Sequence, residues 1–105
     1  MNRTLTALLA LTLAGVAQAD PAADGKILFE ENCVKCHGDD GRARTWRGWM
    51  FFAEDLSDAE WQDRHDDEAL LRALRRGPGA MPSYEKRLSE EQQQAVVAYV
   101  RTLRR

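Results

Sequence analysis

The five residues Cys33-Val34-Lys35-Cys36-His37 constrain the fold of this chain more than any other feature of its sequence. The pattern C-x-x-C-H is the attachment signature of a c-type haem. Two thiols three residues apart lie on one side of a helical turn, where Cys33 and Cys36 can form thioethers with the vinyl groups of a porphyrin. His37 then lies under the ring as the proximal iron ligand. The motif predicts one covalently bound haem c, around which the chain has to fold.

Two other interpretations of the motif are open. A redox dithiol is expected beside a strand-helix-strand pattern, and a structural zinc site needs a further pair of ligands. Cys33 and Cys36 are the only two cysteines among the 105 residues, and His65 is the only other histidine. Haem attachment is therefore the favoured prediction. With both thiols committed to thioethers, no disulfide is expected.

Residues 1–19 have the pattern of a secretory signal, which leaves residues 20–105 as one haem-binding domain. Arg3 supplies the positive start, an apolar stretch follows, and Ala17-Gln18-Ala19 is a small-residue cleavage pattern. The apolar stretch is about twelve residues long, short of the roughly twenty that span a bilayer. An uncleaved membrane tether is the alternative. We expect export to the periplasm, with no stable membrane insertion after cleavage.

Charge is unevenly distributed along the mature sequence. Removing the signal removes only Arg3 from the charged residues, so the mature chain has 14 Lys and Arg residues and 17 Asp and Glu residues. Acidic residues concentrate between Glu54 and Glu68, whereas basic residues flank the haem motif and the segment around Met81. This asymmetry favours a dipolar molecule that steers an acidic partner onto the haem edge, although a solvated charged surface would give the same pattern. No basic run indicates nucleic-acid binding.

Helical signals predict an all-α fold of about four helices, because no segment alternates with the period of a strand. Capping residues place the helix boundaries. The first expected helix covers about residues 22–36. The second is a short segment with Ser57 as N-cap and Glu60 completing a capping box. The third covers 66–76, with Asp66 as N-cap and Gly77 after its end, and the last begins with Ser89 and Gln92 as a capping box. Gly25 in the first helix is expected to permit close contact with another helix.

Met81 is the predicted distal iron ligand. It lies in Gly77-Pro78-Gly79-Ala80-Met81-Pro82, where small residues let the backbone approach a flat ring and prolines stiffen it. A thioether favours ferrous iron and raises the reduction potential. His65, Met50 or an open sixth position are the alternatives.

The loop between His37 and Ser57 carries a concentration of aromatic residues from Trp46 to Phe52. In a chain of this size, such a cluster is expected to form one wall of the haem pocket. A docking patch for a partner protein is the alternative.

These motifs together resemble the class I c-type cytochromes, in particular the small periplasmic mono-haem proteins of bacteria. The resemblance covers residues 22–105, because the order and spacing of the motifs match throughout. It depends on Gly25-x-x-x-Phe29 leading into Cys33-x-x-Cys36-His37-Gly38, on Asp55-Leu56-Ser57-Asp58, on Gly79-Ala80-Met81-Pro82 and on the closing helix with Ala98-Tyr99-Val100.

The resemblance implies helices wrapped around one haem, with the first and last crossing near Gly25, Phe29 and Tyr99. It also implies His37 and Met81 on opposite faces of the iron. Many relatives have a proline soon after the haem motif, whose neighbouring carbonyl orients the proximal histidine. No proline occurs here between His37 and Pro78, so the residue that orients His37 is left unassigned.

Filled axial positions predict an electron-transfer protein rather than an enzyme, because the iron can change charge without changing ligands. The expected role is a periplasmic single-electron shuttle that docks transiently at its haem edge. Its donor would be a dehydrogenase or quinol-oxidising complex, and its acceptor a terminal oxidase or reductase. The alternatives are a cytochrome subunit permanently bound to a larger redox enzyme, and a haem enzyme or gas sensor with a labile sixth ligand.

Overall fold

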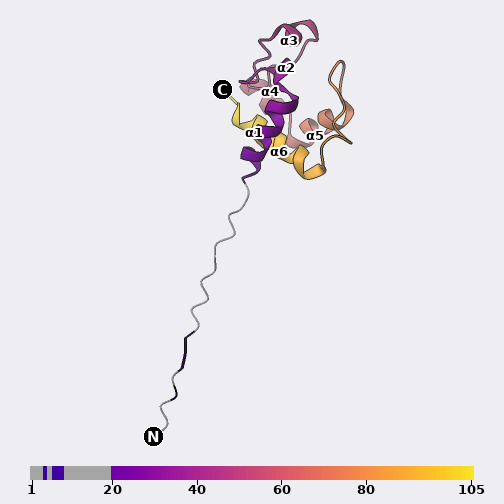
Figure 1. Ribbon diagram of the computed structural model, residues 1–105. Coiled ribbons are helices and arrows are strands. Elements are labelled where there is room, and N and C mark those ends of the chain that lie inside the picture. Colours follow the sequence, from indigo (N-terminus) through magenta and orange to yellow (C-terminus); the bar gives the residue numbers. More distant parts are fainter. Residues whose placement is uncertain (1–3, 5, 9–19) are drawn as a thin grey trace.

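The computed structural model describes residues 4, 6–8 and 20–105, and most of the predicted signal lies outside these residues. The described chain is helical and holds no strand, which confirms the predicted fold class (Figure 1). No helix in this part of the chain has the length and apolarity needed to cross a bilayer. The helices are α1 (Pro21–Asn32), α2 (Val34–His37), α3 (Trp46–Met50), α4 (Ala59–Arg64), α5 (Asp67–Arg76) and α6 (Glu90–Thr102).

The core lies where α1 crosses α6, and α5 packs against α6 beside them. Gly25 permits this crossing, because a Cβ atom at this position would lie 1.9 Å from the Ala95 carbonyl oxygen. Phe29 is fully buried, and its ring lies 5.2 Å from that of Tyr99. The predicted close contact at Gly25 and the crossing near Phe29 and Tyr99 are both confirmed.

Three predicted helix boundaries are confirmed in detail. The Asp66 side chain accepts from the Ala69 N–H at 2.8 Å. Helix α5 ends at Arg76 and is capped by Gly77, whose φ of 64° is the left-handed conformation that glycine adopts without strain. Ser89 and Gln92 form the reciprocal capping box at the start of α6. Local capping chemistry was therefore sufficient to place these ends.

Three details differ from the predictions. The first helix breaks at Cys33, which divides it into α1 and α2. The N-cap of α4 is Asp58, whose side chain accepts from the Trp61 N–H at 2.9 Å, and not Ser57, whose hydroxyl and N–H both donate to Asp55 Oδ1, at 2.6 Å and 2.9 Å. The aromatic loop also contains a short helix, α3, that the sequence pattern did not predict.

Candidate functional site

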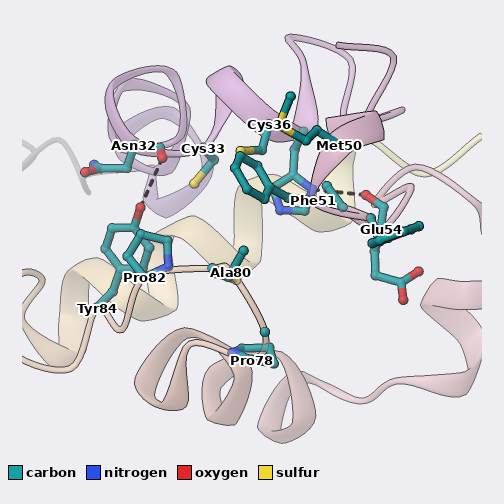
Figure 2. A pocket seen from close by; sticks show the side chains of 15 residues that line it. Asn32, Cys33, Cys36, Met50, Phe51, Glu54, Pro78, Ala80, Pro82 and Tyr84 are labelled. Carbon is teal, nitrogen blue, oxygen red and sulfur yellow. Dashed lines mark hydrogen bonds between the residues drawn. The ribbon is translucent and has the colours of Figure 1, made fainter. Parts of the chain in front are cut away.

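A cavity of about 570 Å³ opens between three segments of the chain (Figure 2). The segments are 32–37 at the junction of α1 and α2, 50–54 after α3, and 78–84 after α5. A smaller cavity of about 120 Å³ lies deeper, lined by core side chains such as Phe29, Leu70 and Val96. Cys33, His37 and Met81 line both cavities. The two therefore form one largely apolar space that extends from the surface into the core.

One helical turn brings both thiols and the imidazole to this space. The His37 N–H donates to the Cys33 carbonyl at 2.9 Å, and both cysteines are free thiols. Burial raises the pKa of the Cys33 thiol to about 11, and the neighbouring Cys36 adds to the shift. A reactive redox dithiol has a lowered thiol pKa instead. The dithiol alternative is therefore disfavoured.

Zinc binding has no support among the described residues either. In this part of the chain, no three His, Cys, Asp or Glu side chains gather in a way that could hold a metal ion. Two thiols and one imidazole at the rim of an apolar slot are instead the donor set that fits a flat, covalently attached macrocycle.

The His37 ring is oriented by a backbone carbonyl that the sequence analysis missed. Its Nδ1 atom lies 3.0 Å from the Glu54 carbonyl oxygen, which can only accept, so Nδ1 carries the proton and Nε2 has a lone pair available to a metal (Figure 2). Burial lowers the pKa of the imidazole, and the contact with Glu54 opposes this only in part. The ring is therefore held neutral, as iron ligation requires.

Hydrogen bonds to near and distant parts of the chain hold the loop that carries Glu54. The Leu56 N–H donates to the Gly41 carbonyl at 2.7 Å, and the Ala53 N–H donates to the Gly48 carbonyl at 2.9 Å. Arg105, after α6, donates to the Ser57 hydroxyl at 2.7 Å and pairs with the Asp55 carboxylate. These contacts fix the position of the carbonyl that orients His37.

The Asp55 carboxylate responds to several of these contacts. Desolvation raises its pKa, but the hydrogen bonds from Ser57 and the nearby Arg105 and Arg42 lower it more, so the pKa lies below its ordinary value. The residue is therefore ionised at neutral pH and available to hold Arg105.

Met81 lines the space from the 78–84 segment. Figure 2 shows Pro78, Ala80 and Pro82 of this segment on the opposite side of the cavity from Cys36 and Phe51. The segment is tied down at one end by Tyr84, whose hydroxyl donates to the Asn32 carbonyl at 3.1 Å and whose N–H donates to the Leu74 carbonyl at 2.7 Å. The structure thus brings all four predicted haem-binding residues to one space.

The alternative distal ligands are placed differently. His65 lines neither cavity: its Nδ1 lies 2.7 Å from the Trp61 carbonyl oxygen, and its ring stacks on that of Trp61. Met50 does line the larger cavity, but on the side of Cys36 (Figure 2).

The aromatic segment divides into two parts. Phe51 and Phe52 line the cavity together with Met50, as expected for a pocket wall. Trp46 and Trp49 line neither cavity and are 66% and 81% exposed. The expected wall therefore consists of the end of the segment, of which Phe52 is itself 90% exposed, and the two tryptophans lie outside the cavity.

Comparison with known proteins agrees with this geometry. Residues 20–100 match the family model described as cytochrome c oxidase, cbb3-type, subunit III. The cbb3-type cytochrome c oxidase subunit FixP of Bradyrhizobium diazoefficiens is 39% identical over 83 residues, which cover 78% of this chain and 27% of FixP. Subunit CcoP of Rhodobacter capsulatus is 34% identical over 90 residues, 78% of this chain and 29% of CcoP. The chain thus spans less than a third of the length of these relatives.

A solved structure described as the KustC0563 c-type cytochrome superposes with a TM-score of 0.74 at 34% identity, covering 78% of this chain and 99% of that one. The fold, the donor residues around one apolar space and the family match all lead to the same assignment. The chain belongs to the cytochrome c family of cbb3-type oxidase subunit III, and it carries covalently bound haem c.

Proposed function

We propose that this chain transfers single electrons through one haem c that is attached by Cys33 and Cys36 and ligated by His37 and Met81. The observation that carries the proposal is that these four residues, from the 33–37 turn and from the 78–84 segment, line one apolar space. The haem supplies a one-electron Fe(III)/Fe(II) couple. An imidazole and a thioether, both from the chain, leave no position for an external ligand.

The residues of the chain would keep the ligands still while the charge of the site changes. The Glu54 carbonyl holds the His37 ring in one tautomer, and Tyr84 anchors the segment that carries Met81. Leu70, Leu74 and Val96 line the deep end and exclude water, which favours the less charged reduced state.

We further propose that this domain works as a subunit bound to a larger redox enzyme, on its periplasmic side, and not as a free shuttle. Relatives named FixP and CcoP are subunits of cbb3-type cytochrome c oxidases, which supports the bound arrangement. The free shuttle is the second candidate, because the match to the c-type cytochrome structure covers 99% of that chain. Residues 20–105 would be the cytochrome domain in both cases, with residues 1–19 as a signal or tether.

Absorption spectra of the purified holoprotein test the haem site. We expect a low-spin c-type spectrum, the weak near-infrared band of a sulfur-to-iron bond in the oxidised state, and no response of the reduced state to carbon monoxide. A high-spin spectrum or ready carbon monoxide binding would contradict Met81 ligation and favour a haem enzyme or gas sensor.

Size-exclusion chromatography of gently solubilised membranes from the native host tests the arrangement. Coelution of the haem with oxidase activity is expected for a bound subunit. Elution as a small, stable and fully folded species would favour the free shuttle instead.

A further inference from the structure

Helix α3 presents two tryptophans to solvent. Met50, Phe51 and Phe52, which follow them, are exposed as well, but these three line the haem cavity. Trp46 and Trp49 are three residues apart, so their side chains lie on one face of the helix. A tryptophan side chain has an area of about 150–250 Å², and these two are 66% and 81% exposed. Neither lines the haem cavity, so a group bound there does not account for their exposure.

The helix that carries them is held firmly against the cysteine turn. The Thr45 hydroxyl accepts from the Gly48 N–H at 2.8 Å and donates to the Cys36 carbonyl at 2.7 Å. Gly48 is buried, and a Cβ atom at this position would lie 2.4 Å from the same carbonyl oxygen. The tryptophans are therefore preorganised at a fixed distance from one of the two haem-attaching cysteines, and little conformational entropy would be lost if they docked.

Three basic residues lie on or beside α3 or on the helix that it contacts: Arg47 on α3, Arg44 just before it, and Lys35 on α2. Within the residues that the structure describes, none of the three forms an ion pair with a carboxylate. Arg47 instead stacks over the Trp46 ring, with its guanidinium carbon 5.2 Å from the ring centre. The arginines at the end of α6 differ, because Arg101 and Arg104 are paired with Asp67 and Asp63.

We propose that Trp46 and Trp49, with Lys35, Arg44 and Arg47, form a docking face for a redox protein that presents an apolar recess ringed by carboxylates. Tryptophan and arginine are the residue types that anchor protein interfaces, and the unneutralised cations select an acidic partner. The contact of α3 with the Cys36 turn places this face next to the haem attachment, where an electron can enter or leave. The inference rests on the proposed electron-transfer function and names the surface that serves it.

The test measures second-order electron transfer from an acidic plant-type [2Fe–2S] ferredoxin, used as the probe, to the oxidised holoprotein in a stopped-flow instrument. At low protein concentration this rate constant is proportional to the affinity of the encounter complex. We expect Trp46→Ala/Trp49→Ala to lower it by at least about tenfold. Arg44→Glu/Arg47→Glu should also lower it, and should flatten its dependence on salt.

Matched controls come from the exposed face of α1. Ile27 is 58% exposed and Lys26 is an exposed cation. Ile27→Ala and Lys26→Glu should leave the rate constant within about twofold of the wild type, since neither lies at the docking face. Unchanged absorption spectra and reduction potentials in all variants would exclude an effect on the haem itself.

Several outcomes would overturn the inference. If wild type accepts electrons but the tryptophan variant reacts as fast as Ile27→Ala, the docking face is wrong while the proposed function stands. If wild-type holoprotein accepts no electrons, both fail. Concentration-dependent dimers that the tryptophan substitutions abolish would assign the face to a second copy of this chain. Binding to vesicles of phosphatidylcholine and phosphatidylglycerol, lost in the same variant, would assign it to a lipid surface.

Discussion

The two sides of the haem space are supported in opposite ways. On the side of His37, hydrogen bonds from α2, from the loop before α4 and from the end of the chain converge on the segment that carries Glu54. On the side of Met81, residues Pro78 to Ala80 are exposed, and the segment is held at its end by Tyr84, which donates to Asn32 and Leu74, and by the Ser83 hydroxyl, which donates to the Arg75 carbonyl. The proximal side is thus fixed by many contacts and the distal side by few. Local opening should begin where contacts are sparse.

Met81→Ala should have the largest effect, because residues 78–84 contain no other sulfur or imidazole side chain that could ligate the iron. We expect carbon monoxide to bind the reduced protein, the near-infrared sulfur band to vanish, and the free energy of unfolding to fall by about 2–5 kcal/mol. Optical titration with carbon monoxide and urea denaturation measure these changes. Met50→Ala is the matched control and should retain the band, because Met50 lies on the side of Cys36. Loss of the band in Met50→Ala and not in Met81→Ala would reverse the assignment.

Gly48→Ala probes the proximal side. Its Cβ would lie 2.4 Å from the Cys36 carbonyl oxygen and 2.6 Å from that of Ala43, so backbone has to move. We expect destabilisation of about 3 kcal/mol in urea unfolding. On the distal side, the Cβ atom of Gly79→Ala would have no neighbouring atom within 4 Å. This variant should lose only about 1 kcal/mol, because alanine is strained at a φ of 59°. Equal losses in the two variants would show that the proximal side is not the more tightly packed.

Tyr84→Phe removes the hydrogen bond from the distal segment to Asn32 but keeps the buried ring. We expect a loss of about 1 kcal/mol in thermal unfolding, with the near-infrared band retained. Tyr99→Phe should change stability less, because within the described chain the Tyr99 hydroxyl forms no hydrogen bond. A larger loss in Tyr99→Phe would indicate that Tyr84 is not the anchor.

Arg105→Ala should have the smallest effect, below about 1 kcal/mol, because its pair with Asp55 is partly exposed. Since the pKa of folded Asp55 lies below the ordinary 3.8, its interactions stabilise the wild type above that pH and are lost as the pH falls through the folded pKa. The variant should therefore lose less stability than the wild type on acidification below about pH 4.

Urea titrations between neutral and acidic pH measure the difference. Arg104→Ala, which breaks a pair with the more exposed Asp63, is the control and should keep the wild-type acid profile.

Features that depend on residues close together in the chain could be predicted from the sequence alone. The haem motif, the cap at Asp66, the capping box of Ser89 and Gln92, and the proline-flanked Met81 each involve groups a few residues apart, and the structure bears out the helix ends among them. Ser57 was assigned wrongly as a cap, because Asp58, the next residue, accepts from the Trp61 N–H instead. Both residues are good caps, and the choice between them depends on how the loop before α4 folds.

The amino-acid sequence by itself determined the cofactor class, the all-α fold and the residues that could bind a haem, because covalent attachment and helix capping are short-range. Tertiary structure alone decided what orients His37, since Glu54 contributes a backbone carbonyl from 17 residues away and every residue has one. It also decided that Arg105 reaches Asp55 across 50 residues, and that Phe51 and Phe52 line the cavity while Trp46 and Trp49 lie outside it. Such contacts depend on the path of the whole chain, which no local pattern encodes.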